Sequence, residues 1–163
     1  MDPRQLYQRT APALLRKCER VLGNRPDAED VVQQLFVDLI HRGRLDVDLP
    51  YLYTAATRRC LNRIRDHRRR TELAARHGEG LLWFEAPRLD DRVLSQDLLH
   101  TLLDRLDDRA AEILVLHFVD GMDQGEVAEL LSTSRRTVVK HVARIREVAA
   151  SLDAAPAPDG GRP

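Results

Sequence analysis

The chain has 163 residues, 43% of them hydrophobic, with 26 basic and 26 acidic side chains. It shows no apolar run long enough to cross a bilayer and no signal-peptide pattern at its start, which argues against a membrane or exported protein and predicts a cytoplasmic one. The zero net charge conceals segregation: residues 1–70 carry 15 Lys/Arg against 9 Asp/Glu, residues 71–130 carry 5 against 14, and residues 131–163 carry 6 against 3. Basic ends of this kind suit phosphate backbones.

Two helices are predicted before residue 41. In the first, apolar residues recur at helical spacing from Leu6 to Leu22, and Gly23-Asn24 supplies a C-terminal stop signal. The second opens at Pro26-Asp27, with Asp27 as the expected N-cap. Its apolar stripe follows helical periodicity without a break and comprises Ala28, Val31, Val32, Leu35, Phe36, Leu39 and Ile40.

A third helix is predicted from about Tyr51 to Arg70. Its buried stripe is Leu52, Ala56, Cys60 and Ile64. Another face begins with an aromatic residue and continues with basic and polar ones, at Tyr51, Arg58, Asn62, Arg65 and Arg69. The two cysteines, Cys18 and Cys60, are interpreted as buried hydrophobes and not as a disulfide or metal site, because they lie far apart in apolar stripes.

The strong apolar periodicity ends after the third helix. Residues 71–92 contain Gly78 and Pro87 and are predicted to form an acidic linker, which places a domain boundary there. A second helical domain follows at 93–152, and the tail 153–163, rich in small residues, Pro and Gly, is expected to be disordered. Since no convincing alternating strand pattern is visible, the predicted fold class is all-α, with two small helical domains joined by a linker.

The second domain is predicted to hold four helices, the last two forming a helix-turn-helix that begins at Gln124. Ala128 permits close helix approach, and the expected buried contacts between the two helices are Val127, Leu131, Val138 and Val142. The turn has Ser132 where Gly is usual, which predicts either some strain or an altered turn. Such a unit props one helix so that its exposed face fits the major groove of DNA.

The final helix, predicted from about Ser134 to Ala150, has a basic face opposite its apolar one. Arg136 and Thr137 are candidates for base contacts, with neighbouring basic residues as phosphate contacts. The full set predicted to bind DNA is Ser134, Arg135, Arg136, Thr137, Lys140 and Arg144. On an isolated helix these side chains could equally form a solvated face, but the preceding tight turn favours DNA binding.

Three features together resemble the extracytoplasmic-function sigma factors of the sigma-70 family. They are Asp27-Ala-Glu-Asp-Val-Val-Gln-Gln-Leu-Phe-Val-Asp-Leu-Ile, the arginine-rich third helix and the C-terminal helix-turn-helix, in the expected order over roughly residues 4–150. The resemblance implies a promoter-recognition factor without enzymatic activity, metal or cofactor. Its implied partners are promoter DNA and core RNA polymerase. The chain would contact the polymerase at the clamp coiled coil of the largest subunit and at the flap. Many relatives are restrained by an anti-sigma factor, which leaves room for one here.

The resemblance also assigns roles to residues. The polymerase contacts carried over to the second helix are Asp30, Gln33, Gln34 and Asp38, which would otherwise only keep that face soluble. The melted strand of the -10 element would meet the face with Tyr51, Arg58, Asn62, Arg65 and Arg69, because stacking surfaces and positive charge suit a single strand. One of Tyr51 and Tyr53 is expected to pack in the core instead. The final helix would read the -35 duplex.

Two departures from the family pattern bear on these roles. Relatives usually have Trp-Leu where this chain has Tyr51-Leu52, and Asn where it has Arg58, so its -10 preference stays open.

In the family the linker threads through the polymerase cleft. Its acidic residues would then lie near nucleic-acid phosphates and keep the linker displaceable; they are Glu79, Glu85, Asp90 and Asp91.

Three other functions are compatible with parts of this pattern. A self-sufficient helix-turn-helix regulator would use residues 1–90 to sense or dimerise, and would bind DNA without polymerase. An enzyme is disfavoured because the six histidines are scattered without ligand spacing and no phosphate loop is present. A sigma-like decoy would occupy polymerase without opening promoters.

Overall fold

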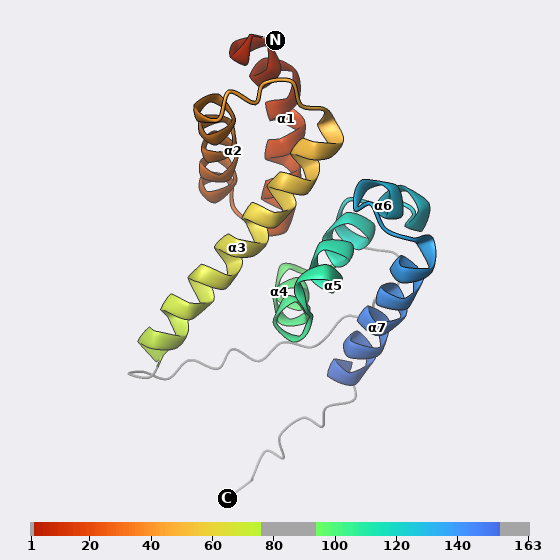
Figure 1. The fold of residues 1–163 in the computed structure, drawn as a ribbon. Helices are drawn as coiled ribbons and strands as arrows, with labels where there is room; N and C mark the ends of the chain where they lie inside the picture. The colour runs from red at the N-terminus through yellow and green to blue at the C-terminus, as the bar shows by residue number, and fades with distance from the viewer. Residues whose placement is uncertain (1, 76–93, 154–163) are drawn as a thin grey trace, which may run out of the picture.

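The computed structural model describes residues 2–75 and 94–153, and every regular element in these two ranges is helical, which confirms the all-α prediction. The N-terminal domain consists of α1 (Pro3–Leu22), α2 (Arg25–His41) and α3 (Leu49–Ala75). The C-terminal domain consists of α4 (Gln96–Arg105), α5 (Asp108–Ile113), the π-helical turn η1 (Leu114–Val119), α6 (Gln124–Leu130) and α7 (Arg135–Asp153). Figure 1 shows the two groups of helices side by side.

The N-terminal domain packs α1 against both α2 and α3 around one apolar core. The predicted stripes supply this core, because Leu14, Val32, Leu52 and Ala56 are all fully or almost fully buried. Ile40 was expected to belong to it, but 49% of its surface is exposed. It lies in the last turn of α2 and lines a shallow groove with Tyr7 and Phe36 near the start of α1, so no helix covers it.

Helix boundaries in the N-terminal domain follow from their caps. Gly23 ends α1 with a left-handed φ of 78°, as its sequence predicted. The prediction of Asp27 as the N-cap of α2 was wrong: Asn24 holds that position and accepts a hydrogen bond from the Asp27 backbone N–H at 2.9 Å. Helix α3 also runs beyond the predicted Tyr51–Arg70, because the Asp48 side chain accepts from the Tyr51 N–H and no Gly or Pro interrupts residues 71–75.

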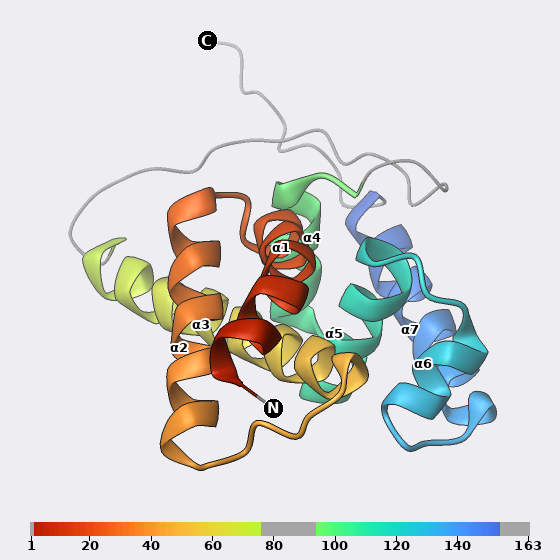
Figure 2. The same ribbon diagram turned by 90° about the horizontal axis from the view of Figure 1, so that it is seen from above.

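The C-terminal domain surrounds α5 and η1 with α6 and α7. The segment 110–119 is not one regular α-helix, because its last six residues form a π-helical turn, with the Asp120 N–H donating to the Val115 carbonyl at 2.9 Å. Gly121 follows with a φ of 75° and ends the segment. Contacts between the domains run from α3 to α5 and from α1 to α4, and Figure 2 shows α5 between α3 and α7.

Candidate nucleic-acid and polymerase interface

The helix-turn-helix predicted from the sequence is present as α6, a tight turn and α7. Asp123 caps α6 by accepting from the backbone N–H groups of Gly125 and Glu126, and these bonds hold the pKa of its carboxyl below the ordinary value. The Glu126 carboxylate accepts from the Asp123 N–H in return, which completes a capping box. Val127, Leu131, Val138 and Val142 are buried as predicted.

The turn between the two helices is strained at the predicted position. Ser132 has a φ of 50°, in the left-handed region that glycine adopts without cost. Its N–H donates to the Glu129 carbonyl and the Thr133 N–H donates to the Ala128 carbonyl, which is the Schellman pattern at a helix end. The Ser134 hydroxyl then accepts from the Thr137 N–H at 3.1 Å and so caps the start of α7.

Helix α7 presents a basic face to solvent. Its other face is buried through Val138, Val142 and Ile145. The residues predicted to bind DNA all lie in the first half of the helix or just before it, and all are exposed except Thr137, which is half-buried; they are Ser134, Arg135, Arg136, Thr137, Lys140 and Arg144. Within the described ranges Arg136, Lys140 and Arg144 form no ion pair, so their charge is available to a partner.

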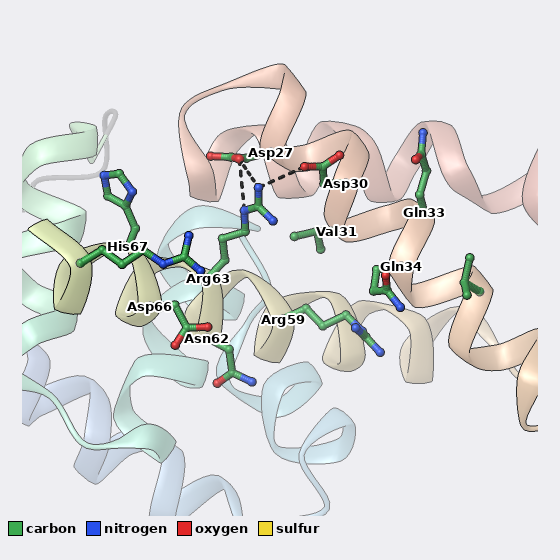
Figure 3. Close-up of a pocket in the computed structure, with 12 residues that line it drawn as sticks. Asp27, Asp30, Val31, Gln33, Gln34, Arg59, Asn62, Arg63, Asp66 and His67 are labelled. Atoms are coloured by element: carbon green, nitrogen blue, oxygen red, sulfur yellow. Dashed lines mark hydrogen bonds and ion pairs between the residues drawn. The ribbon is translucent and has the colours of Figure 1, made fainter.

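A polar groove of about 570 Å³ lies between α2 and α3, and three of the four predicted polymerase-binding residues, Asp30, Gln33 and Gln34, line it (Figure 3). The fourth, Asp38, accepts from the Gln34 amide at 3.0 Å and pairs with Arg59. Hydrogen bonds from Arg59 and Gln34 hold the pKa of the Asp38 carboxyl below its ordinary value. The structure therefore gathers these four residues on one polar surface of α2.

Arg59 and Arg63 anchor this surface, a role that the sequence pattern did not predict. Arg63 pairs with Asp27 and, at 3.1 Å, with Asp30, as Figure 3 shows. Hydrogen bonds from Asn24 and then Arg63 lower the pKa of Asp27. The available signal was spacing, because Arg59 and Arg63 are four residues apart and share a side of α3 next to the buried stripe.

The predicted -10 face of α3 is divided among several environments. Arg58 and Arg65 pair with Glu112 and Asp108 of α5, at 2.5 and 2.7 Å. Arg69 is exposed, whereas Asn62 lines the groove with α2. The guanidinium of Arg44 lies 5.3 Å from the centre of the Tyr51 ring.

Of the two tyrosines at the start of α3, Tyr53 packs against the core, as expected for one of the pair. The ammonium of Lys17 lies 5.1 Å from the centre of its ring. Tyr51 keeps 37% of its surface exposed and is therefore the one available for stacking. The acidic residues Glu79, Glu85, Asp90 and Asp91, expected along the linker, lie outside the described residues.

The two cysteines are buried and no disulfide joins them, as predicted, but the fold brings their thiols within hydrogen-bonding reach. The hydrogen bond to Cys18 and burial raise the pKa of the Cys60 thiol. Their distance in the sequence hid this contact, which joins α1 to α3. His117 is partly buried and its Nδ1 lies 2.6 Å from the Met122 carbonyl, in keeping with a satisfied core residue.

Comparison with known families agrees with this geometry. The family model for Sigma-70 region 2 matches residues 6–70, and the model for Sigma-70, region 4 matches residues 96–147. The chain is 30% identical over 146 residues to the ECF RNA polymerase sigma factor SigW of Bacillus subtilis, covering 80% of this chain and 77% of that protein. It is also 30% identical over 161 residues to the RNA polymerase sigma factor NccH of Alcaligenes xylosoxydans xylosoxydans, covering 87% and 81%.

A solved structure has a similar fold. It is the sigma factor RpoE in complex with the anti-sigma factor NepR from Bartonella quintana, with a TM-score of 0.52 and 17% identity over 94% of this chain and 98% of that one. No helix in residues 2–75 or 94–153 is long and apolar enough to span a membrane. From these matches and the paired helical domains, the chain belongs to the extracytoplasmic-function sigma factors of the sigma-70 family, which bind core RNA polymerase and direct promoter recognition.

Proposed function

We propose that residues 1–70 bind polymerase and the -10 strand, that residues 93–152 read the -35 duplex, and that 71–92 and 153–163 act as linker and tail. The observation that carries this division is the exposed basic half of α7 above a fully buried apolar face. A major-groove reader needs a helix held from one side and charged on the other. The separate family matches to residues 6–70 and 96–147 support assigning one promoter element to each domain.

In the C-terminal domain, Arg136 and Thr137 are proposed to contact base edges because they lie at the start of α7. Arg135, Lys140 and Arg144 would hold phosphates on either side, and Ser134 would add a hydroxyl contact. Most of these side chains are exposed, and the hydroxyls of Ser134 and Thr137 lie 2.8 Å apart, which orders the end of the helix that would enter the groove.

In the N-terminal domain, the proposed polymerase contacts are Asp30, Gln33, Gln34 and Asp38. Their support is a continuous polar surface on α2 in which two carboxylates are fixed by arginines of α3. The proposed -10 contacts are Tyr51, Arg58, Asn62, Arg65 and Arg69. An exposed tyrosine and a series of arginines supply the stacking and the charge that a single strand requires.

We further infer that the chain acts in the cytoplasm as a binding factor without catalysis of its own. An anti-sigma factor is a reasonable partner, since RpoE of Bartonella quintana is held by one in its solved complex. Its surface on this chain would include the faces of α2, α3 and α7 that polymerase and DNA need.

Run-off transcription with purified core polymerase and a genomic promoter library tests this function. We expect discrete start sites that depend on the protein and share two spaced elements. Arg136→Ala should weaken these transcripts, whereas the matched control Arg146→Ala should not, because Arg146 lies on the same helix with its guanidinium 5.9 Å from the centre of the Phe118 ring. Polymerase binding without any specific transcript would contradict the proposal and favour a decoy.

A further inference from the structure

One apolar side chain lies within the basic surface of α7. Val139 keeps 45% of its surface exposed, and it is the only large hydrophobic residue so exposed in residues 94–153. The others in the described ranges, among them Tyr7, Ile40 and Tyr51, all belong to the N-terminal domain. A single exposed valine is ordinary on most protein surfaces. The neighbours of Val139 are what give it a use.

The residues around Val139 are those proposed to bind DNA. Arg135 and Arg136 lie one turn before it and Lys140 follows it, and all three are exposed. At about 100° per residue, Val139 lies about 60° around the helix from Arg136. Ala143, one turn after Val139, is also exposed and carries only a methyl group, so that position does not cover the valine. Val139 therefore faces the same partner as the arginines.

The orientation of Val139 is fixed by its helix. Val138 beside it and Ile145 further along are fully buried, so α7 cannot rotate about its axis without exposing its apolar face. The hydroxyl and the carbonyl of Ser134 accept from the N–H groups of Thr137 and Val138, at 3.1 and 3.2 Å, which makes the first turn regular. A β-branched side chain has one strongly preferred rotamer in a helix. Val139 thus meets a partner in a preset orientation.

The chemistry of valine limits what Val139 can recognise, because its side chain neither donates nor accepts a hydrogen bond. It cannot hold a phosphate, so it adds nothing to contacts with the DNA backbone. The base edges in the major groove carry donors and acceptors and one apolar group, the C5-methyl of thymine. Contact between that methyl group and the valine removes apolar surface from water on both sides and is favourable. Val139 is therefore suited to thymine.

The position of Arg136 indicates where this thymine lies. Arg136 is three residues before Val139, so the two are about 4.5 Å apart along an axis that rises about 1.5 Å per residue. Successive base pairs are about 3.4 Å apart along the duplex. With α7 in the major groove, the two side chains reach the same base pair or neighbouring ones. Arginine most often reads guanine, which valine cannot do.

We propose that Val139 is a specificity-determining residue that reads the 5-methyl group of a thymine in the -35 element, at or next to the base pair contacted by Arg136. It extends the DNA-binding set predicted from the sequence, which holds polar residues only. Selection at this position comes from an apolar contact, whereas Arg136 supplies hydrogen bonds. This inference rests on the proposed function of α7 and adds a base preference to it.

Replacement of thymidine by deoxyuridine tests this directly, because deoxyuridine lacks only the 5-methyl group and forms the same base pair. The probe is the promoter duplex that gives the strongest run-off transcript with the wild-type protein and core polymerase. Each thymine of its -35 element, on either strand, is replaced in turn by deoxyuridine. The Kd of the complete complex of protein and core polymerase for each fluorescein-labelled duplex is measured by anisotropy at one salt concentration.

We expect one of these replacements to weaken binding by the wild type about threefold to fivefold, the effect of about one buried methyl group. Val139→Ala should lose most of this difference, because its shorter side chain leaves the methyl group without a close partner. Val139→Ile is the matched control and should retain the difference, since it keeps an apolar β-branched side chain. Circular dichroism should give the same helicity for both variants, because the position is exposed.

The inference is overturned when every deoxyuridine replacement changes the Kd of the wild type and of Val139→Ala by the same factor. Weaker binding of Val139→Ala to all duplexes alike would also overturn it, and would assign Val139 to a protein contact within the complex. A -35 element without thymine has the same consequence. Failure of the proposed function gives a different result, since the wild type then yields no protein-dependent transcript at all, which overturns both.

Discussion

The basic surfaces of α7 and α3 differ in what lies opposite them. On α7, Arg136, Lys140 and Arg144 face solvent and form no ion pair in the described part of the chain, whereas on α3 Arg58 and Arg65 are paired with carboxylates of α5. Both helices rest on an apolar face, so the difference lies in their charged neighbours alone. A chain with zero net charge can thus leave one basic surface exposed to solvent and pair the arginines of another with its own carboxylates.

The largest expected effect concerns the apolar support of α7. Ile145 is fully buried, and Ile145→Ala should lower the free energy of unfolding by about 2–5 kcal/mol, because it leaves a cavity under the helix. Urea unfolding monitored by circular dichroism measures this. Val139, 45% exposed on the same helix, is the control, and Val139→Ala should change stability by less than about 0.5 kcal/mol. Equal losses would show that α7 is not held from one side.

A second prediction separates base contacts from phosphate contacts on the open surface. Arg136→Ala should cost about 1–3 kcal/mol at one base pair of the -35 element and relax the preference there. Lys140→Ala should weaken binding to all duplexes and reduce the salt dependence by about one phosphate contact. Duplex titrations at several salt concentrations measure both. Identical behaviour of the two variants would remove the distinction made along α7.

A third, smaller effect is expected in the turn before α7. Ser132→Gly should raise the free energy of unfolding by up to about 1 kcal/mol, because glycine adopts a φ of 50° without the strain that a side chain brings. Thermal unfolding of the full-length protein provides the measurement. Ser132→Ala is the matched variant and should gain nothing. A stabilised alanine variant would mean that the hydroxyl, and not the backbone, limits the turn.

The smallest effect is a pH dependence of the contact between α4 and the end of α1, where His100 Nε2 lies 3.4 Å from the Val21 carbonyl. Burial lowers the pKa of His100 below its ordinary value of 6.5, and the charges of Arg68 and His67 lower it further, against the Val21 carbonyl and Asp97. Packing of His100 against the end of α1 therefore disfavours the protonated ring. The contact should be strongest above pH 6.5 and should weaken as the pH falls below this value.

Scattering measured between about pH 7.5 and pH 5.5 checks this direction, since carboxylates stay ionised over that range. His100→Gln keeps a hydrogen-bond donor but does not titrate, so its compactness should vary less with pH. A wild type that becomes more compact on acidification would reverse the sign worked out for His100.

The fold was largely predictable because helical periodicity is a local property of the chain. The stripes on α1, α2 and α3, the stop at Gly23 and the strained Ser132 all depend on near neighbours in the sequence. The two errors have different causes, one in the tertiary packing and one in the choice of a helix cap. Ile40 fits its stripe but has no helix above it, and Asn24 competes successfully with Asp27 for the cap.

The contacts between domains were beyond the sequence argument because they join residues about 40 to 100 positions apart. Lys17 did carry a signal, since it occupies a core position of α1 beside Cys18 and between Leu14 and Val21. A buried charge in an apolar stripe indicates a partner, and the Lys17 ammonium pairs with the buried Asp120 carboxylate, but nothing in the sequence identifies Asp120 as that partner. The distribution of charge along the sequence indicates an acidic middle of the chain, but it does not identify the arginines that pair with those carboxylates.

Arg58 and Arg65 are paired with carboxylates of α5 in the structure and are proposed to bind the -10 strand, so strand binding requires the two domains to separate there. Energy transfer between fluorophores at Gln8→Cys on α1 and Glu147→Cys on α7 follows the separation of the domains directly, since both sites are exposed and the native cysteines are buried. Transfer should be high in the free protein and should fall when core polymerase and promoter DNA are added. Unchanged transfer in a complex that produces transcripts would contradict the account.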